Sequence, residues 1–371
     1  MSSRRGLLKA GTVGAVGAVA GAVLAKPAIA QANPEVRWRM PSSFPRSLDT
    51  IYGGGATVSR RVAQLTDGKF KIDLFPPPEI VPAFGTFDAV QNGTVEIAHS
   101  ASFYYTGKDP TLAFDSQVPF GFNFRMINAW HQAGGAREVM RELFESYNMV
   151  SIPCGNTCTQ MGGWFRKEIK TMDDMKGLKI RIPGLGGAIM QRLGAVPQQI
   201  AGGDIYPALE RGAIDAAEWV GPYDDEKLGF NKVAPFYYYP GWWEGGASLN
   251  LHINKAKWDS LPKHYQEAIE VAAKEATLDM VAKYDVMNPD ALRRLVASGT
   301  QLRPWPREIM LAAYTEANKY YEELATTNPR WKKVWDHFKA FRDSQYQWAR
   351  IAEFSYMQIA LAAHAQAGRP G

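Results

Sequence analysis

The stretch GLKIRIPGLGGAIMQRLGAVPQQIAGGDIYPALERGAIDAAEWVGP, residues 177–222, alternates short apolar runs with segments of helical spacing. Glycines and prolines separate these segments, as they do at turns between strands and helices. The pattern predicts strands at 177–182, 196–200 and 214–218, with helices at 186–193 and from an N-cap at Asp204 to Gly212. Alternation of strands and helices is typical of an α/β fold.

The first hundred residues repeat the alternation. They predict three strands, at 36–40, 69–75 and 95–99, and two helices, at 48–66 and 84–92. This order implies parallel strands joined by crossover helices. Two such blocks, with the chain crossing between them, predict two α/β lobes. Ligands of open α/β sheets bind in the crevice at the carboxyl ends of the strands, so we expect a ligand site between the lobes.

The C-terminal segment has a different character. Residues 331–367 contain no Gly or Pro, and they predict one helix of about 35 residues, roughly 50 Å long. Large apolar residues recur in it, mostly at spacings of three and four: Val334, Phe338, Phe341, Trp348, Ile351 and Phe354. Such a helix either clasps both lobes of a monomer or packs on another subunit of a dimer.

We therefore expect four segments. Residues 1–30 form an export signal, 31–153 a first α/β lobe to which later segments return, 154–250 a second α/β lobe, and 251–371 a helical C-terminal region.

The N-terminus has the pattern of a twin-arginine export signal, with Arg4 and Arg5 before an apolar Gly/Ala-rich stretch. An uncleaved anchor or an ordinary helix is the alternative. The leader carries four basic residues and no acid, so its removal lowers the formal net charge from +5 to +1. A nearly neutral mature chain argues against nucleic acid as a partner. The signal predicts a periplasmic location.

Common catalytic motifs are missing. Cys154 and Cys158 have no histidine at zinc-site spacing, and we expect both to be free, buried thiols. Residues 184–187 are glycine-rich and precede a helix, but Ile189 stands where a third glycine of a dinucleotide loop belongs. Zinc binding and nucleotide binding are therefore not predicted.

Polar residues among aromatics and glycines suggest a binding site. Arg181 lies near the end of a predicted strand, where an arginine is suited to hold a carboxylate with two hydrogen bonds. Glu218 ends another predicted strand, and Glu244 follows two tryptophans. Gln160 precedes a Met-Gly-Gly-Trp run. Each of these could by itself be an ordinary surface residue, but together they define a candidate site.

Charge counting predicts a cation at that site. Arg181, Glu218 and Glu244 together carry −1, and an anionic ligand would bring the total to −2. Buried like charges are costly, so a positive ion is needed to join the acids to the anion. Carboxylate, amide and backbone oxygens suit sodium or calcium rather than zinc.

Several segments resemble a known family. SSFPRSLDTIYGG, GLKIRIPG, YYYPGWWEGG and the run from Val196 to Phe230 are similar to the solute receptors of tripartite ATP-independent periplasmic (TRAP) transporters of the DctP type, in particular to their 2-oxoacid (α-keto acid) branch. The resemblance covers essentially the whole mature chain. It implies a two-lobe periplasmic solute-binding protein fold with a long C-terminal helix, a permease as partner, and a homodimer that exchanges this helix.

The resemblance also implies a role for each site residue. Arg181 would bind the substrate carboxylate, while Phe103 and Tyr104 would line the pocket. The cation would be held by Gln160, Glu218, the Trp219 carbonyl and Glu244, and it would bring Gln160, Glu218 and Trp219 close to the substrate.

The predicted function is a receptor, not an enzyme, for a small 2-oxo monocarboxylate such as pyruvate, with sodium as the expected ion and calcium as the alternative. A receptor for 2-hydroxy acids such as lactate, with calcium, is the second interpretation. In a third, Glu218 and Glu244 form the acid/base pair of a hydrolase. A scaffold protein without a ligand is a fourth.

Overall fold

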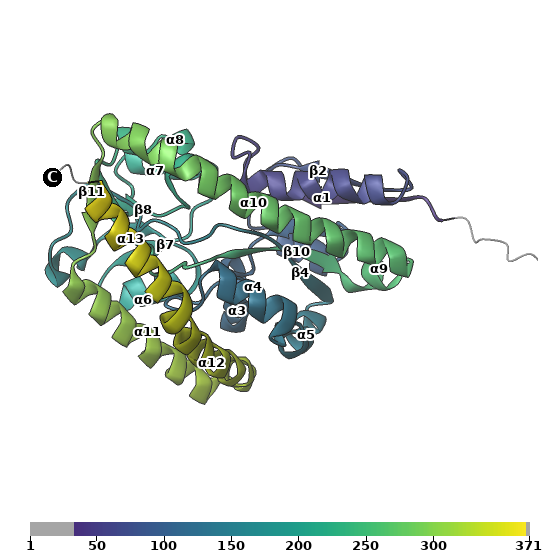
Figure 1. Ribbon diagram of the computed structural model, residues 1–371. Coiled ribbons are helices and arrows are strands. Elements are labelled where there is room, and N and C mark those ends of the chain that lie inside the picture. Colours follow the sequence, from purple (N-terminus) through teal and green to yellow (C-terminus); the bar gives the residue numbers. More distant parts are fainter. Residues whose placement is uncertain (1–32, 369–371) are drawn as a thin grey trace, which may run out of the picture. The chain divides into compact units, whose positions relative to one another are not determined.

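The computed structural model of the protein describes residues 33–368. The export signal expected at residues 1–30 lies outside them. The described strands form two groups, each accompanied by helices (Figure 1). Among these residues, no helix is both long and apolar enough to span a bilayer.

The first group has two small sheets. It contains β1 (Val36–Pro41), α1 (Ile51–Leu65), β2 (Phe70–Phe75), α2 (Thr86–Gln91), β3 (Ile97–Ser100), β4 (Met149–Asn156) and β10 (Ser248–Asn254). As predicted, β1 and β2 are parallel. The third predicted strand, β3, meets the end of β1 in a parallel bridge between Ser42 and His99, as expected, but on its other side it pairs antiparallel with β10. The chain returns after the second group, and β10 inserts between β3 and β4.

The second group is one six-stranded sheet. It contains β5 (Trp164–Phe165), β6 (Lys179–Arg181), α6 (Gly184–Arg192), β7 (Val196–Gln198), α7 (Gly202–Glu210), β8 (Ala216–Ala217), α8 (Pro222–Leu228), β9 (Phe236–Tyr239) and β11 (Gln301–Pro304). The predicted strands β6, β7 and β8 are confirmed but shorter, and β6 is parallel to both neighbours. Asp204 is not the N-cap of α7 but lies in its first turn, after the N-cap Ala201.

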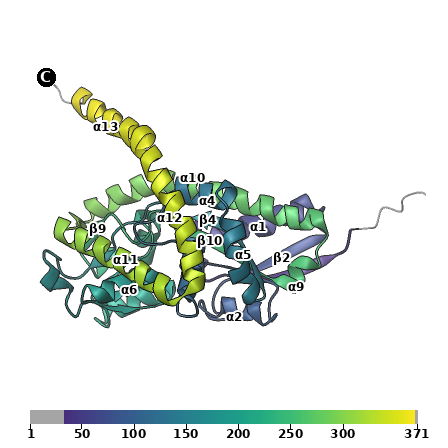
Figure 2. The same ribbon diagram turned by 90° about the horizontal axis from the view of Figure 1, so that it is seen from below.

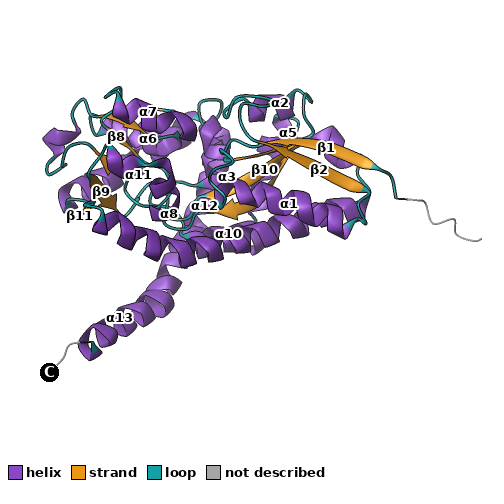
Figure 3. Cartoon of the chain, turned by 90° about the horizontal axis from the view of Figure 1, so that it is seen from above, coloured by secondary structure: helices purple, strands orange, loops and turns teal. Residues whose placement is uncertain are grey.

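Helices cover and connect the two groups. They are α3 (Ala113–Ser116), α4 (Phe124–Ala133), α5 (Ala136–Ser146), α9 (Lys255–Asp259), α10 (Lys263–Ala297) and α11 (Arg307–Thr327). The helix α10 contacts α1 and β4 in the first group and α8 in the second, so it runs along both (Figure 3). The expected lobe boundary at residue 153 falls inside β4, and the division into segments stays a prediction.

The long C-terminal helix is present. It consists of α12 (Pro329–Ala349), a π-helical turn η5 (Arg350–Phe354) and α13 (Ser355–Ala367). The helix begins two residues before the expected start, because the Asn328 side chain caps it by accepting bonds from the backbone N–H groups of Arg330 and Trp331, both 3.0 Å away. Pro329 occupies the first helical position, where its lack of a backbone N–H costs no hydrogen bond.

The two ends of this helix have different surroundings. In α12, Val334 and Phe338 are buried, and the helix packs against α4, α5 and α11. Figure 2 shows α13 extending away from the other elements. Its apolar residues, and those of η5, are exposed: Ile351, Phe354, Tyr356, Met357, Ile359 and Leu361. Within the described chain, α13 therefore does not clasp the two groups of strands.

Both cysteines are free. Cys154 is fully buried in β4, as expected, and burial raises the pKa of its thiol. Cys158 is only half-buried, so the expectation of two buried thiols is wrong for this residue. It lies in the loop after β4 with a positive φ of 58°.

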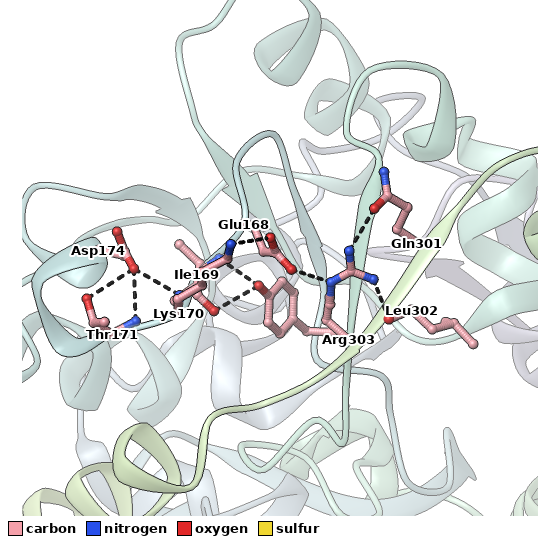
Figure 4. Close-up of polar contacts among 9 residues, drawn as sticks. Glu168, Ile169, Lys170, Thr171, Asp174, Gln301, Leu302 and Arg303 are labelled. Atoms are coloured by element: carbon pink, nitrogen blue, oxygen red, sulfur yellow. Dashed lines mark hydrogen bonds and ion pairs between the residues drawn. The ribbon is translucent and has the colours of Figure 1, made fainter.

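Polar contacts join β11, at one edge of the second sheet, to the segment before β6, through Glu168, Arg303 and the turn at Asp174 (Figure 4). The Tyr238 hydroxyl donates to the Ile169 carbonyl at 3.0 Å and accepts from the Ile169 N–H at 2.6 Å. Next to it, Arg303 of β11 pairs with Glu168. Asp174 accepts the N–H of Thr171 at 2.9 Å and so closes the turn that leads into β6. This turn anchors the strand that carries Arg181.

A buried carboxylate links α8 to α10. Asp224 is fully buried and accepts the Tyr284 hydroxyl at 2.7 Å, while its Oδ1 has no hydrogen-bond partner. Burial raises the pKa of Asp224 to about 7. Because the folded-state pKa lies above the unfolded value, the stability it contributes is full below about pH 4 and is lost as the pH rises through about 7.

We expect Asp224→Asn to flatten this pH dependence. Asparagine still accepts the tyrosine hydroxyl but does not ionise. As the pH rises from 5 to 8, the unfolding free energy of the variant should therefore increase by on the order of 1–3 kcal/mol relative to that of wild type. Urea unfolding at both pH values measures the change, with Asp290→Asn on the exposed surface of α10 as control. Parallel pH curves for wild type and Asp224→Asn would contradict the assignment.

Candidate ligand-binding site

A small cavity lies between the two groups of strands. Its walls come from both groups and from the segments that cross between them: Phe44, Ile51, Phe103, Tyr104, Thr157, Gln160, Arg181, Pro183, Glu218, Trp219, Val220, Glu244, Ala247 and Leu249. All seven residues predicted from the sequence are in this set. The space available to the centre of a water-sized sphere is about 10 Å³, which is room for about one water molecule.

Arg181 lies at the end of β6 and is 2 % exposed. Its Nε donates to the Ile200 carbonyl and its Nη1 to the Glu218 carbonyl, each at 3.0 Å. Nη1 also pairs with the Glu218 carboxylate. Its Nη2 is buried without a hydrogen-bond partner. One edge of the guanidinium is thus fixed by the protein, and the other nitrogen is left to bind an acceptor.

Glu218 and Glu244 are both buried acids. Burial raises the pKa of Glu218 to about 7, although Arg181 partly opposes this. The pKa of Glu244 is raised well above its usual range by burial and then by the charge of Glu218. One guanidinium therefore does not offset both carboxylates. The pair is costly to ionise without further positive charge.

Gln160 adds a neutral oxygen. Its Nε2 donates to the Thr157 hydroxyl at 3.0 Å, which directs the amide, and its Oε1 is buried without a partner. The backbone N–H of Gln160 donates to the Glu244 carbonyl at 3.0 Å, so the two segments are held together. A buried, unpartnered acceptor beside two carboxylates is suited to a cation.

Trp219 packs against the arginine. The Arg181 Cζ lies 5.0 Å from the centroid of the Trp219 ring. Gly202 at the start of α7 makes room for this indole, because a Cβ there would lie 2.6 Å from Trp219 Cη2. Gly202 therefore has a packing role, and it helps to fix Trp219, whose carbonyl is a predicted ion ligand.

Phe103 and Tyr104 form the opposite wall, from the short 3-10 helix η1 (Ser102–Tyr105). Burial raises the pKa of Tyr104, so its hydroxyl stays neutral and can donate. Gln199 Nε2 donates to the Tyr104 carbonyl at 3.0 Å and links this wall to the second group of strands.

Sequence reasoning missed Asp225, which supports the site from behind. It is 1 % exposed and accepts from Tyr237 Oη at 2.7 Å, from Trp164 Nε1 at 2.9 Å and from the Val220 N–H at 3.2 Å. It thereby joins β5 and β9 to the segment that follows Trp219. In the sequence it stands in the run DDEK, where nothing distinguishes the buried Asp224 and Asp225 from the exposed Lys227.

The donors fit a hard cation. In residues 33–368, no group of three or more His, Cys, Asp or Glu side chains is arranged to hold a metal. The cavity instead offers two carboxylates, one amide oxygen and backbone. This mixed oxygen set suits sodium or calcium and lacks the nitrogen and sulfur ligands of zinc.

Comparisons with known proteins identify the family. Residues 42–328 match the family described as bacterial extracellular solute-binding protein, family 7, DctP. A monocarboxylate 2-oxoacid-binding periplasmic protein of Nostoc is 51 % identical over 88 % of this chain and 90 % of its own.

Solved structures are similar as well. A TRAP transporter solute-binding protein from Bordetella bronchiseptica, a dimer with calcium and picolinate in one site, is 51 % identical over 90 % of this chain and all of its own, with a TM-score of 0.89. One from Pseudoalteromonas atlantica, with sodium and pyruvate, is 36 % identical over 87 % of this chain and 99 % of its own, with a TM-score of 0.85. The chain belongs to the DctP family of extracytoplasmic solute receptors that serve TRAP transporters.

Proposed function

We propose that this receptor binds a small 2-oxo monocarboxylate, with pyruvate as the simplest example, together with a sodium or calcium ion, and delivers it to the permease. The observation that carries the proposal is the pair of buried, unpartnered groups in one cavity, Nη2 of Arg181 and Oε1 of Gln160. One is a donor for an anion and the other an acceptor for a cation.

The charges give each residue a role. Arg181 would hold the ligand carboxylate, through Nη2 and by sharing Nη1 with Glu218. Gln160, Glu218, Glu244 and the Trp219 carbonyl would hold the ion. When bound, the ion offsets the two carboxylates and attracts the carboxylate and 2-oxo oxygens of the ligand.

The walls determine ligand size. Phe103, Tyr104 and Trp219 leave little room, so a short acid fits better than a long one or a dicarboxylate. A cavity with room for about one water cannot admit an acid and an ion without separation of its walls. When the walls close again, the loss of water strengthens the pairing with Arg181 and with the ion.

Two names among the similar proteins support the choice of ligand. The Nostoc relative is named for 2-oxoacids, and the Pseudoalteromonas protein holds pyruvate with sodium. Calcium accompanies picolinate in the Bordetella protein. We propose sodium as the ion that accompanies the 2-oxo acid. The alternative is calcium, together with 2-hydroxy acids such as lactate as ligands.

We also propose that the protein is a homodimer that uses the apolar residues of α13. Their exposure supports this, because contiguous exposed apolar residues mark interfaces. The dimer of the Bordetella relative is consistent with it. We further propose that residues 1–30 direct export to the periplasm by the twin-arginine route. The arginine pair of this leader supports the proposal.

Replacement of Arg181 by alanine should abolish tight binding. It removes a charge-assisted pair and leaves buried carboxylates without their guanidinium, which costs about 2–5 kcal/mol of binding free energy. Arg181→Lys should restore only part, because an ammonium cannot make the two parallel bonds. Calorimetric titration of metal-stripped protein with pyruvate, lactate and longer oxo acids, with and without sodium or calcium, measures both effects. Lys179→Ala, an exposed position in the same strand, is the control.

An unchanged affinity for every acid in Arg181→Ala would contradict the proposed function. Binding of lactate with calcium, but not of pyruvate with sodium, would favour the alternative ligand class.

The double variant Ile351→Asp, Ile359→Asp should be monomeric. These side chains are 68 % and 71 % exposed, so the change leaves the buried face of α12 intact but places charge in the proposed interface. Native mass spectrometry measures the subunit number. Gln358→Asp, on the same helix, is the control. A double variant that remains dimeric would show that α13 is not the interface.

A further inference from the structure

An acidic residue outside the cavity joins its two walls. Asp49, just before α1, pairs with Lys227 of α8 and with Lys283 of α10. The Tyr223 hydroxyl lies 3.3 Å from Asp49 Oδ2, and Lys283 Nζ lies 3.3 Å from the Asp49 carbonyl. We call these four residues the Asp49 cluster. It contains one carboxylate from the first group of strands, two residues of α8 in the second group, and one lysine from the helix that contacts both.

The two lysines of the cluster have a counter-charge only while Asp49 is in contact with them. Lys227 also lies over the Tyr223 ring, 3.8 Å from its centroid. In the described part of the chain, neither lysine has a second carboxylate within ion-pair distance. Burial and the charge of Lys283 lower the pKa of Lys227. Without Asp49, two ammonium groups would face each other with no counter-charge in contact.

The position of the cluster relates it to closure. Ile51, two residues after Asp49, lines the cavity, and so does Val220, just before α8. No member of the cluster lines the cavity itself. Separation of the walls, which the small cavity requires for an acid to enter, moves α8 away from the start of α1. It would therefore break the contacts between Asp49 and α8.

We propose that Asp49 is an affinity-determining residue that acts at a distance from the ligand: its contacts with Lys227 and Tyr223 of α8 form as the walls close, and they slow release, while Lys283 of α10 holds Asp49 in place. The inference rests on the proposed function for the ligand used to test it. The cluster is partly exposed, with side-chain exposures of 48 % for Asp49, 28 % for Lys227 and 38 % for Lys283. One such pair, between Asp49 and Lys227, corresponds to an effect of about two- to fivefold on the dissociation rate.

Stopped-flow mixing of the full mature protein with pyruvate, in saturating sodium or calcium, tests this. Asp49→Asn keeps the shape of the side chain and removes its charge. We expect its dissociation rate to rise about two- to fivefold, with little change in the association rate. In about 1 M salt, where the screening length is about 3 Å, the difference should shrink. Lys227→Met should act in the same direction as Asp49→Asn.

The control is Asp73→Asn. It also removes an ion pair, that of Asp73 with Arg37, but this pair lies inside the β1–β2 sheet and does not connect the two walls of the cavity. A dissociation rate of Asp49→Asn equal to that of Asp73→Asn would overturn the inference. So would a change in the association rate alone. Equal melting temperatures of wild type and Asp49→Asn without ligand establish that the fold is intact. If Asp49→Asn does not fold, Lys227→Met decides by the same criteria.

Failure of the proposed function gives a different result. Wild-type protein that binds none of the acids would refute the ligand assignment. The inference on Asp49 is then judged by X-ray scattering at low salt, where Asp49→Asn should have the larger radius of gyration. Equal radii in that case would overturn it.

Discussion

The buried pair of Arg181 and Glu218 is the interaction on which the rest of the site depends. A guanidinium and a carboxylate, both almost fully removed from water, are retained only where the geometry is good and the remaining donors and acceptors are satisfied. The strand β6, the Ile200 carbonyl and the Trp219 ring fix the arginine on three sides. The second carboxylate, Glu244, makes the sum of the ionised side chains negative, which is why we propose that a cation joins the ligand at this site.

The fold brings these groups together from distant parts of the chain. Arg181 and Glu218 come from neighbouring strands of one sheet, whereas Gln160 and Glu244 come from segments that cross between the sheets. Because β10 returns to the first sheet directly after the segment of Glu244, opening and closing of the walls must act on these crossings. Ligand binding and the relative position of the two walls are therefore coupled by the chain itself.

Sequence patterns located the strands that carry Arg181 and Glu218, since a single charged residue between isoleucines and an acid at a strand end are local signals. The ion-ligating roles proposed for Gln160 and Trp219 rest on resemblance to a family, because neither residue type marks such a role. Other features had no local signal at all. The insertion of β10 depends on pairing with β3 and β4, which lie far earlier in the chain; Asp225 is indistinguishable from its neighbours, and Asp49 meets lysines 178 and 234 residues away.

The π-helical turn η5 has a consequence for the C-terminal helix. A wide turn holds one more residue than an ordinary one, and one residue corresponds to a rotation of about 100° around the helix axis. The apolar stripe that faces inward along α12 is therefore offset past Ala349. One continuous helix thus presents two apolar faces in different directions. The face on α12 packs against the rest of its own subunit, and the face on α13 does not.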